Sequence, residues 1–98
     1  MSPKLIYSLR DFFSTEPVEK AWIFGSYARG EETSESDIDI LVRYSKDTCL
    51  GLFGIAELIE KLEKLLGKRV DLVEEDTLYP RVAKMVNAEK IQVYERNA

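Results

Sequence analysis

Two short segments of this sequence could together carry out phosphate chemistry. The first is Gly25-Ser26, which ends an apolar run and leads into a predicted short helix that is closed by Gly30. A strand that feeds a glycine-serine turn and then a helix presents free backbone N–H groups and the positive end of a helix dipole, and both suit a phosphate. Gly25 and Ser26 are therefore candidate ligands for a nucleotide phosphate.

The second segment is the β-branched run Asp37-Ile38-Asp39-Ile40, which is typical of a strand. On a strand, residues i and i+2 lie on one face, about 7 Å apart along the chain. Asp37 and Asp39 are thus predicted to direct two carboxylates to one point, while Ile38 and Ile40 face the core. Such oxygens suit Mg²⁺, and two ions about 4 Å apart can clamp the attacking and leaving oxygens in nucleotidyl transfer.

Arg29 lies one helical turn beyond Ser26, and its position admits two interpretations. Its guanidinium could contact the triphosphate or the metal site. It could equally form an ordinary salt bridge with the acidic segment 31–37, because surface arginines pair with carboxylates routinely and weakly. We expect the polar segment 31–36 to be an exposed loop.

Periodicity and turn residues predict the elements that hold these segments. We expect helices over 3–13, from the turn after Thr48 to about Leu66, and from about Pro80 to Asn87 or Ala88, with strands over 21–24, 37–42, 69–73 and 91–94. The second helix is expected to bury a stripe of Leu52, Ile55, Ile59, Leu62 and Leu66, and the last helix a stripe of Leu78, Val82, Met85 and Val86. The pattern predicts one α/β (α+β) domain over residues 1–98, with a mixed sheet of three or four strands and the site at one sheet end.

Composition restricts the chemistry that is open to the chain. With fourteen basic and eighteen acidic residues the net charge is −4, which argues against nucleic-acid binding as the main role. The absence of histidine excludes imidazole bases and imidazole zinc ligands, so any catalysis must use carboxylates, hydroxyls, lysine, arginine or a bound metal. The single Cys49 and the lack of a long apolar run are typical of a soluble, cytoplasmic protein without a membrane segment.

Gly25-Ser26, ten intervening residues and Asp37-x-Asp39 resemble the signature of the nucleotidyltransferase superfamily that includes DNA polymerase β and kanamycin nucleotidyltransferase. In detail, GSYARG followed by SDIDILV is similar to the minimal nucleotidyltransferase (MNT) proteins. The resemblance spans nearly the whole chain and implies a third carboxylate at Asp71, which would join Asp37 and Asp39 at the metals and activate the acceptor hydroxyl. It also implies a single catalytic domain that is often the antitoxin of a HEPN-domain ribonuclease toxin.

Three functions remain open on the sequence. The first is Mg²⁺-dependent transfer of a nucleoside monophosphate, AMP if the donor is ATP, to a hydroxyl; the resemblance implies a tyrosine of the HEPN toxin as acceptor. The second is a binding module that neutralises a partner by covering its surface. The third is a small-molecule nucleotidyltransferase. Arg69 shares the predicted strand face of Asp71 and could meet the substrate phosphates.

Overall fold

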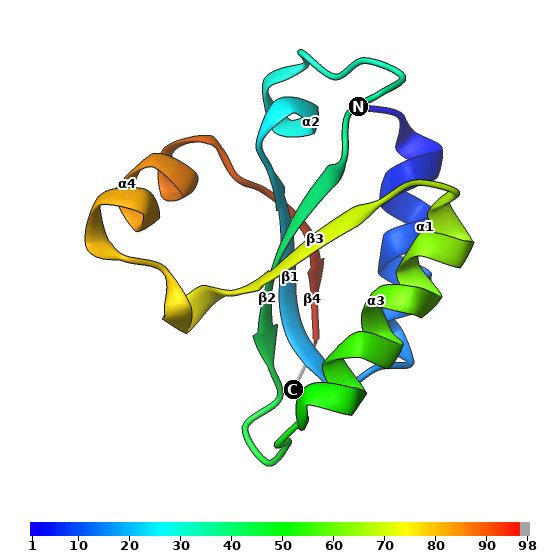
Figure 1. Cartoon of the computed structure of the whole chain (residues 1–98), viewed down its shortest axis with the longest axis vertical. Helices are drawn as coiled ribbons and strands as arrows, with labels where there is room; N and C mark the ends of the chain where they lie inside the picture. The colour runs from blue at the N-terminus through cyan, green and yellow to red at the C-terminus, as the bar shows by residue number, and fades with distance from the viewer. Residues whose placement is uncertain (97–98) are drawn as a thin grey trace.

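A mixed four-stranded sheet in the order β3-β2-β1-β4 forms the centre of the molecule (Figure 1). The computed structural model describes residues 1–96. The central strand β1 pairs antiparallel with β2 and β4, whereas β2 and β3 run parallel. The strands are β1 (Val18–Phe24), β2 (Ile38–Tyr44), β3 (Val70–Glu74) and β4 (Ile91–Glu95). The predicted mixed sheet is confirmed, with four strands.

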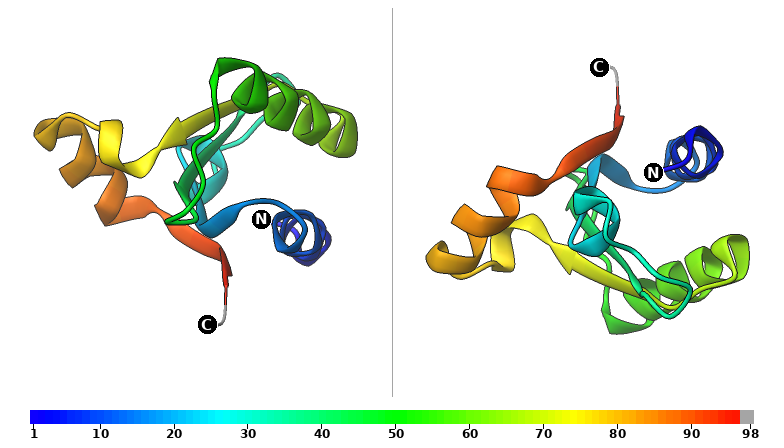
Figure 2. Two further views of the ribbon diagram at one scale, coloured as in Figure 1. Left: turned by 90° about the horizontal axis from the view of Figure 1, so that it is seen from below. Right: turned by 90° about the horizontal axis from the view of Figure 1, so that it is seen from above.

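Helices cover both faces of this sheet, and α4 lies on the opposite side from α1 and α3 (Figures 1 and 2). The helices are α1 (Pro3–Ser14), α2 (Ser26–Arg29), α3 (Leu52–Leu66), the short 3-10 helix η1 (Glu75–Thr77) and α4 (Pro80–Glu89). Ser2 caps α1, because its Oγ accepts a hydrogen bond from the Leu5 N–H at 3.2 Å. No helix within residues 1–96 combines the length and hydropathy needed to cross a bilayer.

The main core lies between the sheet and the pair α1 and α3. Alternate strand residues such as Ile23, Ile38 and Ile40 point into it, as the two-residue period of a strand requires. The buried helical partners come from α1 (Leu9 and Phe13) and α3 (Leu58 and Leu62). The isoleucines flanking Asp39 therefore face the core, as predicted, and leave Asp39 on the opposite face.

A smaller cluster holds α4 against that opposite face. Its buried members are Trp22, Leu41 and Val86. The Trp22 ring also lies under two cations, with Lys90 Nζ at 4.3 Å and Arg43 Cζ at 5.6 Å from its centroid. Because this contact is small, α4 covers only part of the face that carries the aspartates.

Three predicted core positions are wrong. Leu52 is 80% exposed, Met85 is 67% exposed and Val82 is 41% exposed. Leu52 stands in the first turn of α3, and the buried stripe begins later, at Leu58, which is four residues before Leu62 and lies on the same side. On α4 only Val86 is buried, because the small cluster beneath that helix accepts a single side chain.

Candidate active site

The site begins where β1 ends. Gly25 follows Phe24 directly and has φ 73° and ψ −150°, a backbone conformation that only glycine adopts without strain. A Cβ at this position would also overlap the carboxylate of Asp39. The turn then enters α2 at Ser26, and Gly30 closes that helix in the left-handed region.

The carboxylates meet because two strands are in register. Phe24 of β1 is the partner of Asp39 on β2, and Asp39 is in turn the partner of Asp71 on β3. Gly25 therefore directly follows Phe24, the residue of β1 that pairs with Asp39, and so lies next to the carboxylates of Asp39 and Asp71. Asp37 lies immediately before β2 and two residues from Asp39, so the three aspartates occupy neighbouring positions at one end of the sheet.

Crowding changes the acidity of Asp39. Burial and the neighbouring Asp71 and Asp37 charges together raise the pKa of Asp39 to about 6, while Arg29 acts in the opposite direction. At neutral pH Asp39 is thus an ionised carboxylate whose negative charge is only partly compensated.

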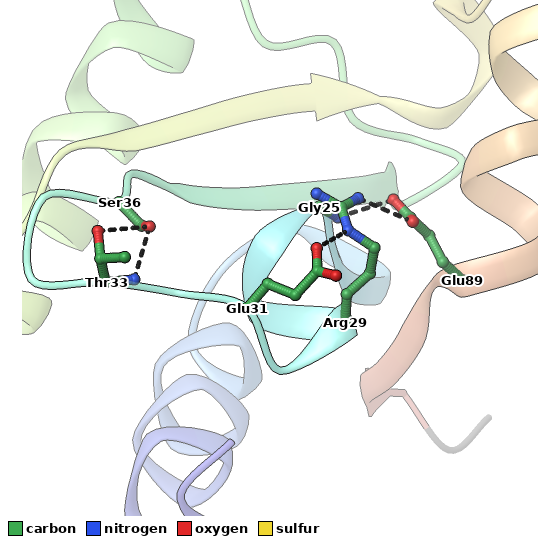
Figure 3. A network of polar contacts seen from close by, with 6 residues as sticks. All are labelled: Gly25, Arg29, Glu31, Thr33, Ser36 and Glu89. Carbon is green, nitrogen blue, oxygen red and sulfur yellow. Dashed lines mark hydrogen bonds and ion pairs between the residues drawn. The ribbon is translucent and has the colours of Figure 1, made fainter.

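Arg29 lies between two glutamates. Its Nε donates to Glu31 Oε1 at 2.7 Å and its Nη1 donates to Glu89 Oε2 at 2.9 Å (Figure 3). Both hydrogen bonds raise the pKa of Arg29 and keep it charged. The salt bridge to the segment 31–37, one of the two interpretations of Arg29, is therefore present.

Glu89 is the residue at this site that sequence reasoning missed. Its Oε1 accepts a hydrogen bond from the Gly25 N–H at 3.0 Å, although the two residues are 64 positions apart. The hydrogen bonds from Arg29 and Gly25 lower the pKa of Glu89. The predicted end of the last helix at Asn87 or Ala88 placed Glu89 beyond it, whereas Glu89 is the last residue of α4. Only the packing of α4 brings this glutamate to the turn.

The donors around Asp39 have the chemistry that a hard cation prefers. Carboxylate oxygens are the usual ligands of Mg²⁺, and a cation would offset the burial and the neighbouring negative charges that raise the pKa of Asp39. Within residues 1–96, no three acidic or cysteine side chains are arranged as a ready-made metal cluster. The metal roles of Asp37, Asp39 and Asp71 therefore stay a prediction. Arg69, just before β3, is exposed and contributes its backbone carbonyl to the Ile38 N–H.

The surface near the aspartates is open. A hollow of about 230 Å³ adjoins Asp37 and is lined by the segments 34–37 and 67–69. Two larger hollows of about 470 and 500 Å³ lie at the other end of β2, around Ser45 and Lys46, away from the aspartates and the Gly25 turn. The hollow beside Asp37 is not lined by Asp39, Asp71 or the Gly25 turn.

The family comparison agrees with this geometry. A family described as "Nucleotidyltransferase domain" matches residues 4–94. The chain belongs to the nucleotidyltransferase family. Within it the chain is a minimal nucleotidyltransferase (MNT). The protein adenylyltransferase MntA of Thermococcus cleftensis is 46% identical over 76 residues, which cover 78% of this chain and 75% of that protein.

Solved structures share the fold of this nucleotidyltransferase. A crystal structure of a toxin-antitoxin with AMP-PNP superposes with a TM-score of 0.77 at 24% identity, covering 94% of this chain and 74% of that one. A complex of a tri-AMPylated Shewanella oneidensis HEPN toxin with its MNT antitoxin gives a TM-score of 0.63 at 28% identity, covering 95% and 68% of the two chains.

Proposed function

We propose that this nucleotidyltransferase transfers AMP from ATP to a hydroxyl of a HEPN-type toxin and thereby acts as its antitoxin. The observation that carries the proposal is the contact between the Gly25 turn and Asp39, with Asp71 in register on the next strand. The relatives support the choice of substrate and partner, since one is named a protein adenylyltransferase and another is an MNT antitoxin bound to an AMPylated toxin.

Each site residue has a role in this proposal. The Ser26 hydroxyl and backbone N–H and the Arg29 guanidinium would bind the terminal phosphates of ATP, and Gly25 would let the backbone approach them closely. Asp71 would orient the acceptor hydroxyl and take its proton. Asp37, Asp39 and Asp71 would hold Mg²⁺, with two ions as the number that this chemistry uses most often.

The reaction then balances without a further reagent. The acceptor oxygen forms a bond to the α-phosphorus of ATP while the bond from that phosphorus to the β-phosphate oxygen breaks. Pyrophosphate leaves with the bonding electrons, and the hydroxyl proton passes to a carboxylate, for which we propose Asp71. When bound, Mg²⁺ would neutralise the charge that develops on the phosphate oxygens.

The relatives favour a macromolecular acceptor over a small one. One is named a protein adenylyltransferase, and another is an MNT antitoxin bound to an AMPylated toxin. Asp71 is exposed at the end of the sheet, so a partner protein that docks over the aspartates could present its hydroxyl there. We therefore rank a small-molecule acceptor below a protein acceptor.

The experiment is label transfer to a purified HEPN-type toxin from the same source cells. The protein, Mg²⁺ and ATP labelled at the α-phosphate are incubated with the toxin, beside the double variant Asp37→Asn/Asp39→Asn and a γ-labelled control. We expect the toxin to be labelled only from the α position and only by the wild-type protein. Mass spectrometry of the labelled toxin would then identify the acceptor residue.

The binding-module alternative makes the opposite prediction. If the toxin takes no label from any of the four nucleotides, and the double variant inhibits its ribonuclease activity as well as the wild type does, inhibition depends on surface contact alone. That result would replace the proposed function.

A further inference from the structure

Glu89 makes two contacts at the site with one carboxylate. Its Oε1 accepts from the Gly25 N–H at 3.0 Å and its Oε2 accepts from Arg29 Nη1 at 2.9 Å (Figure 3). Gly25 forms the turn that approaches Asp39, and Arg29 is the last residue of the short helix α2 that follows this turn. Glu89, the last residue of α4, therefore contacts both the turn and the arginine that we propose for phosphate binding.

The geometry of Arg29 leaves one side of its guanidinium available. Nε is bound by Glu31 and Nη1 by Glu89, while Nη2 has no partner within residues 1–96. A guanidinium is a rigid planar fork, so two anchored nitrogens determine where the third points. An anion that reaches Nη2 would meet a donor that is already oriented.

The Gly25 N–H is likewise already engaged. Because Glu89 accepts its hydrogen bond, this N–H is a support of the turn and is not a donor to the phosphate. The donors left for a phosphate include those of Ser26 and the Nη2 group of Arg29. Glu89 thus supports the turn through the Gly25 N–H, while the Asp39 carboxylate adjoins the Gly25 Cα.

We propose that Glu89 is a positioning residue for nucleotide binding, which holds the Gly25 turn and the Arg29 guanidinium in the orientation that receives the triphosphate. The inference rests on the proposed function, since it assumes that ATP binds at this turn. It assigns a catalytic-site task to α4, which otherwise contacts the sheet through the small cluster around Trp22 and Val86.

A nearby glutamate provides a matched control. Glu75 of η1 pairs with Arg43 Nη2 at 2.8 Å and with Lys90 Nζ at 3.9 Å, and Lys90 directly follows Glu89. Glu75 therefore helps to hold the same end of α4, but it contacts neither Gly25 nor Arg29. A variant at Glu75 weakens the docking of α4 without removing the two contacts in question.

The test measures ATP binding by isothermal titration calorimetry with Mg²⁺ and no acceptor. We expect Glu89→Ala to raise the Kd for ATP about tenfold, which is the usual scale for losing a charge-assisted hydrogen bond. Glu89→Gln, whose amide oxygen can still accept from the Gly25 N–H, should fall between the wild type and Glu89→Ala. Glu75→Gln should change the Kd by less than about twofold.

A second measurement reports the contact itself. In the nucleotide-free protein, the amide resonance of Gly25 should move in Glu89→Ala and stay in place in Glu75→Gln, because only the first variant removes its acceptor. Dispersed amide resonances elsewhere in the spectrum would show that both variants are folded. A Gly25 resonance that did not respond to Glu89→Ala would contradict the contact.

Three outcomes would overturn the proposal. If Glu89→Ala binds ATP as tightly as the wild type, Glu89 does not position the turn. If it binds ATP more tightly, Glu89 competes with the phosphates. If Glu75→Gln weakens binding equally, only the docking of α4 matters. A wild-type protein that binds none of the four nucleotides would instead show that the proposed function is wrong, and the positioning role would fall with it.

Discussion

Gly25 and Asp39 lie in contact, so each of these residues restricts the other. The Gly25 backbone has a positive φ, and its Cα faces the Asp39 carboxylate without room for a Cβ. Asp39 is in turn half-buried and adjoins Asp71 and Asp37, which raises its pKa to about 6. The crowded Asp39 carboxylate therefore reduces the stability of the nucleotide-free protein at neutral pH, and this cost can be measured.

Asp39→Asn is expected to stabilise the metal-free protein at neutral pH. Because the folded pKa of about 6 exceeds the ordinary value of 3.8, the folded state binds more protons between these values and stability falls as pH rises through them. The uncharged asparagine avoids this loss, so we expect a gain of about 1–2 kcal/mol at about pH 7.5, after an allowance for solvent screening, and almost none at about pH 4.

Urea unfolding of both proteins at the two pH values measures this difference. Titration of the carboxylates that do not interact with Asp39 is common to the two proteins and cancels, whereas the interactions of Asp39 with Asp71 and Asp37 are part of the measured difference. An equal free energy of unfolding for wild type and Asp39→Asn at both pH values would show that Asp39 is not crowded.

Gly25→Ala and Gly67→Ala separate backbone strain from the clash with Asp39. Both glycines have a positive φ, but a Cβ at Gly67 has no neighbour within 4 Å, whereas one at Gly25 meets Asp39. We expect Gly67→Ala to cost about 1 kcal/mol and to leave nucleotide binding intact. Gly25→Ala should cost about 2–4 kcal/mol and abolish binding. Chemical unfolding and calorimetry with ATP check the pair, and equal costs would contradict the contact.

At the scale of elements, α4 packs loosely on the face that carries the aspartates. One of its side chains, Val86, is buried, and its last residue reaches the Gly25 turn. Sequence periodicity predicted the helix correctly but overestimated its buried face, because the apolar residues Val82 and Met85 fit a helical stripe as well as Val86 does. Periodicity shows which residues share a side of a helix, but it does not show how much surface lies opposite.

Val86→Ala and Met85→Ala test how α4 is held. Truncation of the buried Val86 should destabilise the protein by about 1–2 kcal/mol and speed amide exchange throughout α4. The same change at Met85, which is 67% exposed, should cost less than about 0.5 kcal/mol. Unfolding curves and hydrogen exchange measure both effects, and a larger cost at Met85 would mean that its exposed face packs against something in solution.

At the scale of the whole molecule, the site draws on four segments that are distant in sequence: the β1–α2 turn, β2, β3 and the end of α4. The sequence predicted the first two because their motif residues stand at the ends of an apolar run and of a strand pattern that determines the face of each carboxylate, and the family resemblance supplied Asp71 on β3. It also predicted the mixed sheet and the helices. It could not predict Glu89, because that contact depends on where α4 docks, which no local pattern encodes.

Binding of ATP with Mg²⁺ should stabilise the entire domain, because all four segments surround the proposed nucleotide site. At a ligand concentration about 100 times the Kd, the gain is about 2.7 kcal/mol, which is a rise of several degrees in Tm. The double variant Asp37→Asn/Asp39→Asn should lose most of this rise. Thermal unfolding with ATP, Mg²⁺, both and neither tests the prediction, and a rise that is the same in the double variant would contradict the metal role of the aspartates.

The parallel pairing of β2 with β3 has a consequence for how misfolding would be detected. A slip of β3 by one residue would expose its buried face, but a slip by two would keep Val70 and Leu72 on the core side. Asp39 would then lie opposite Arg69 or Val73 instead of Asp71. Such a molecule would retain its secondary structure and much of its core, and an arginine partner would even relieve the charge on Asp39. Catalytic activity is therefore a stricter reporter of the strand register than stability is.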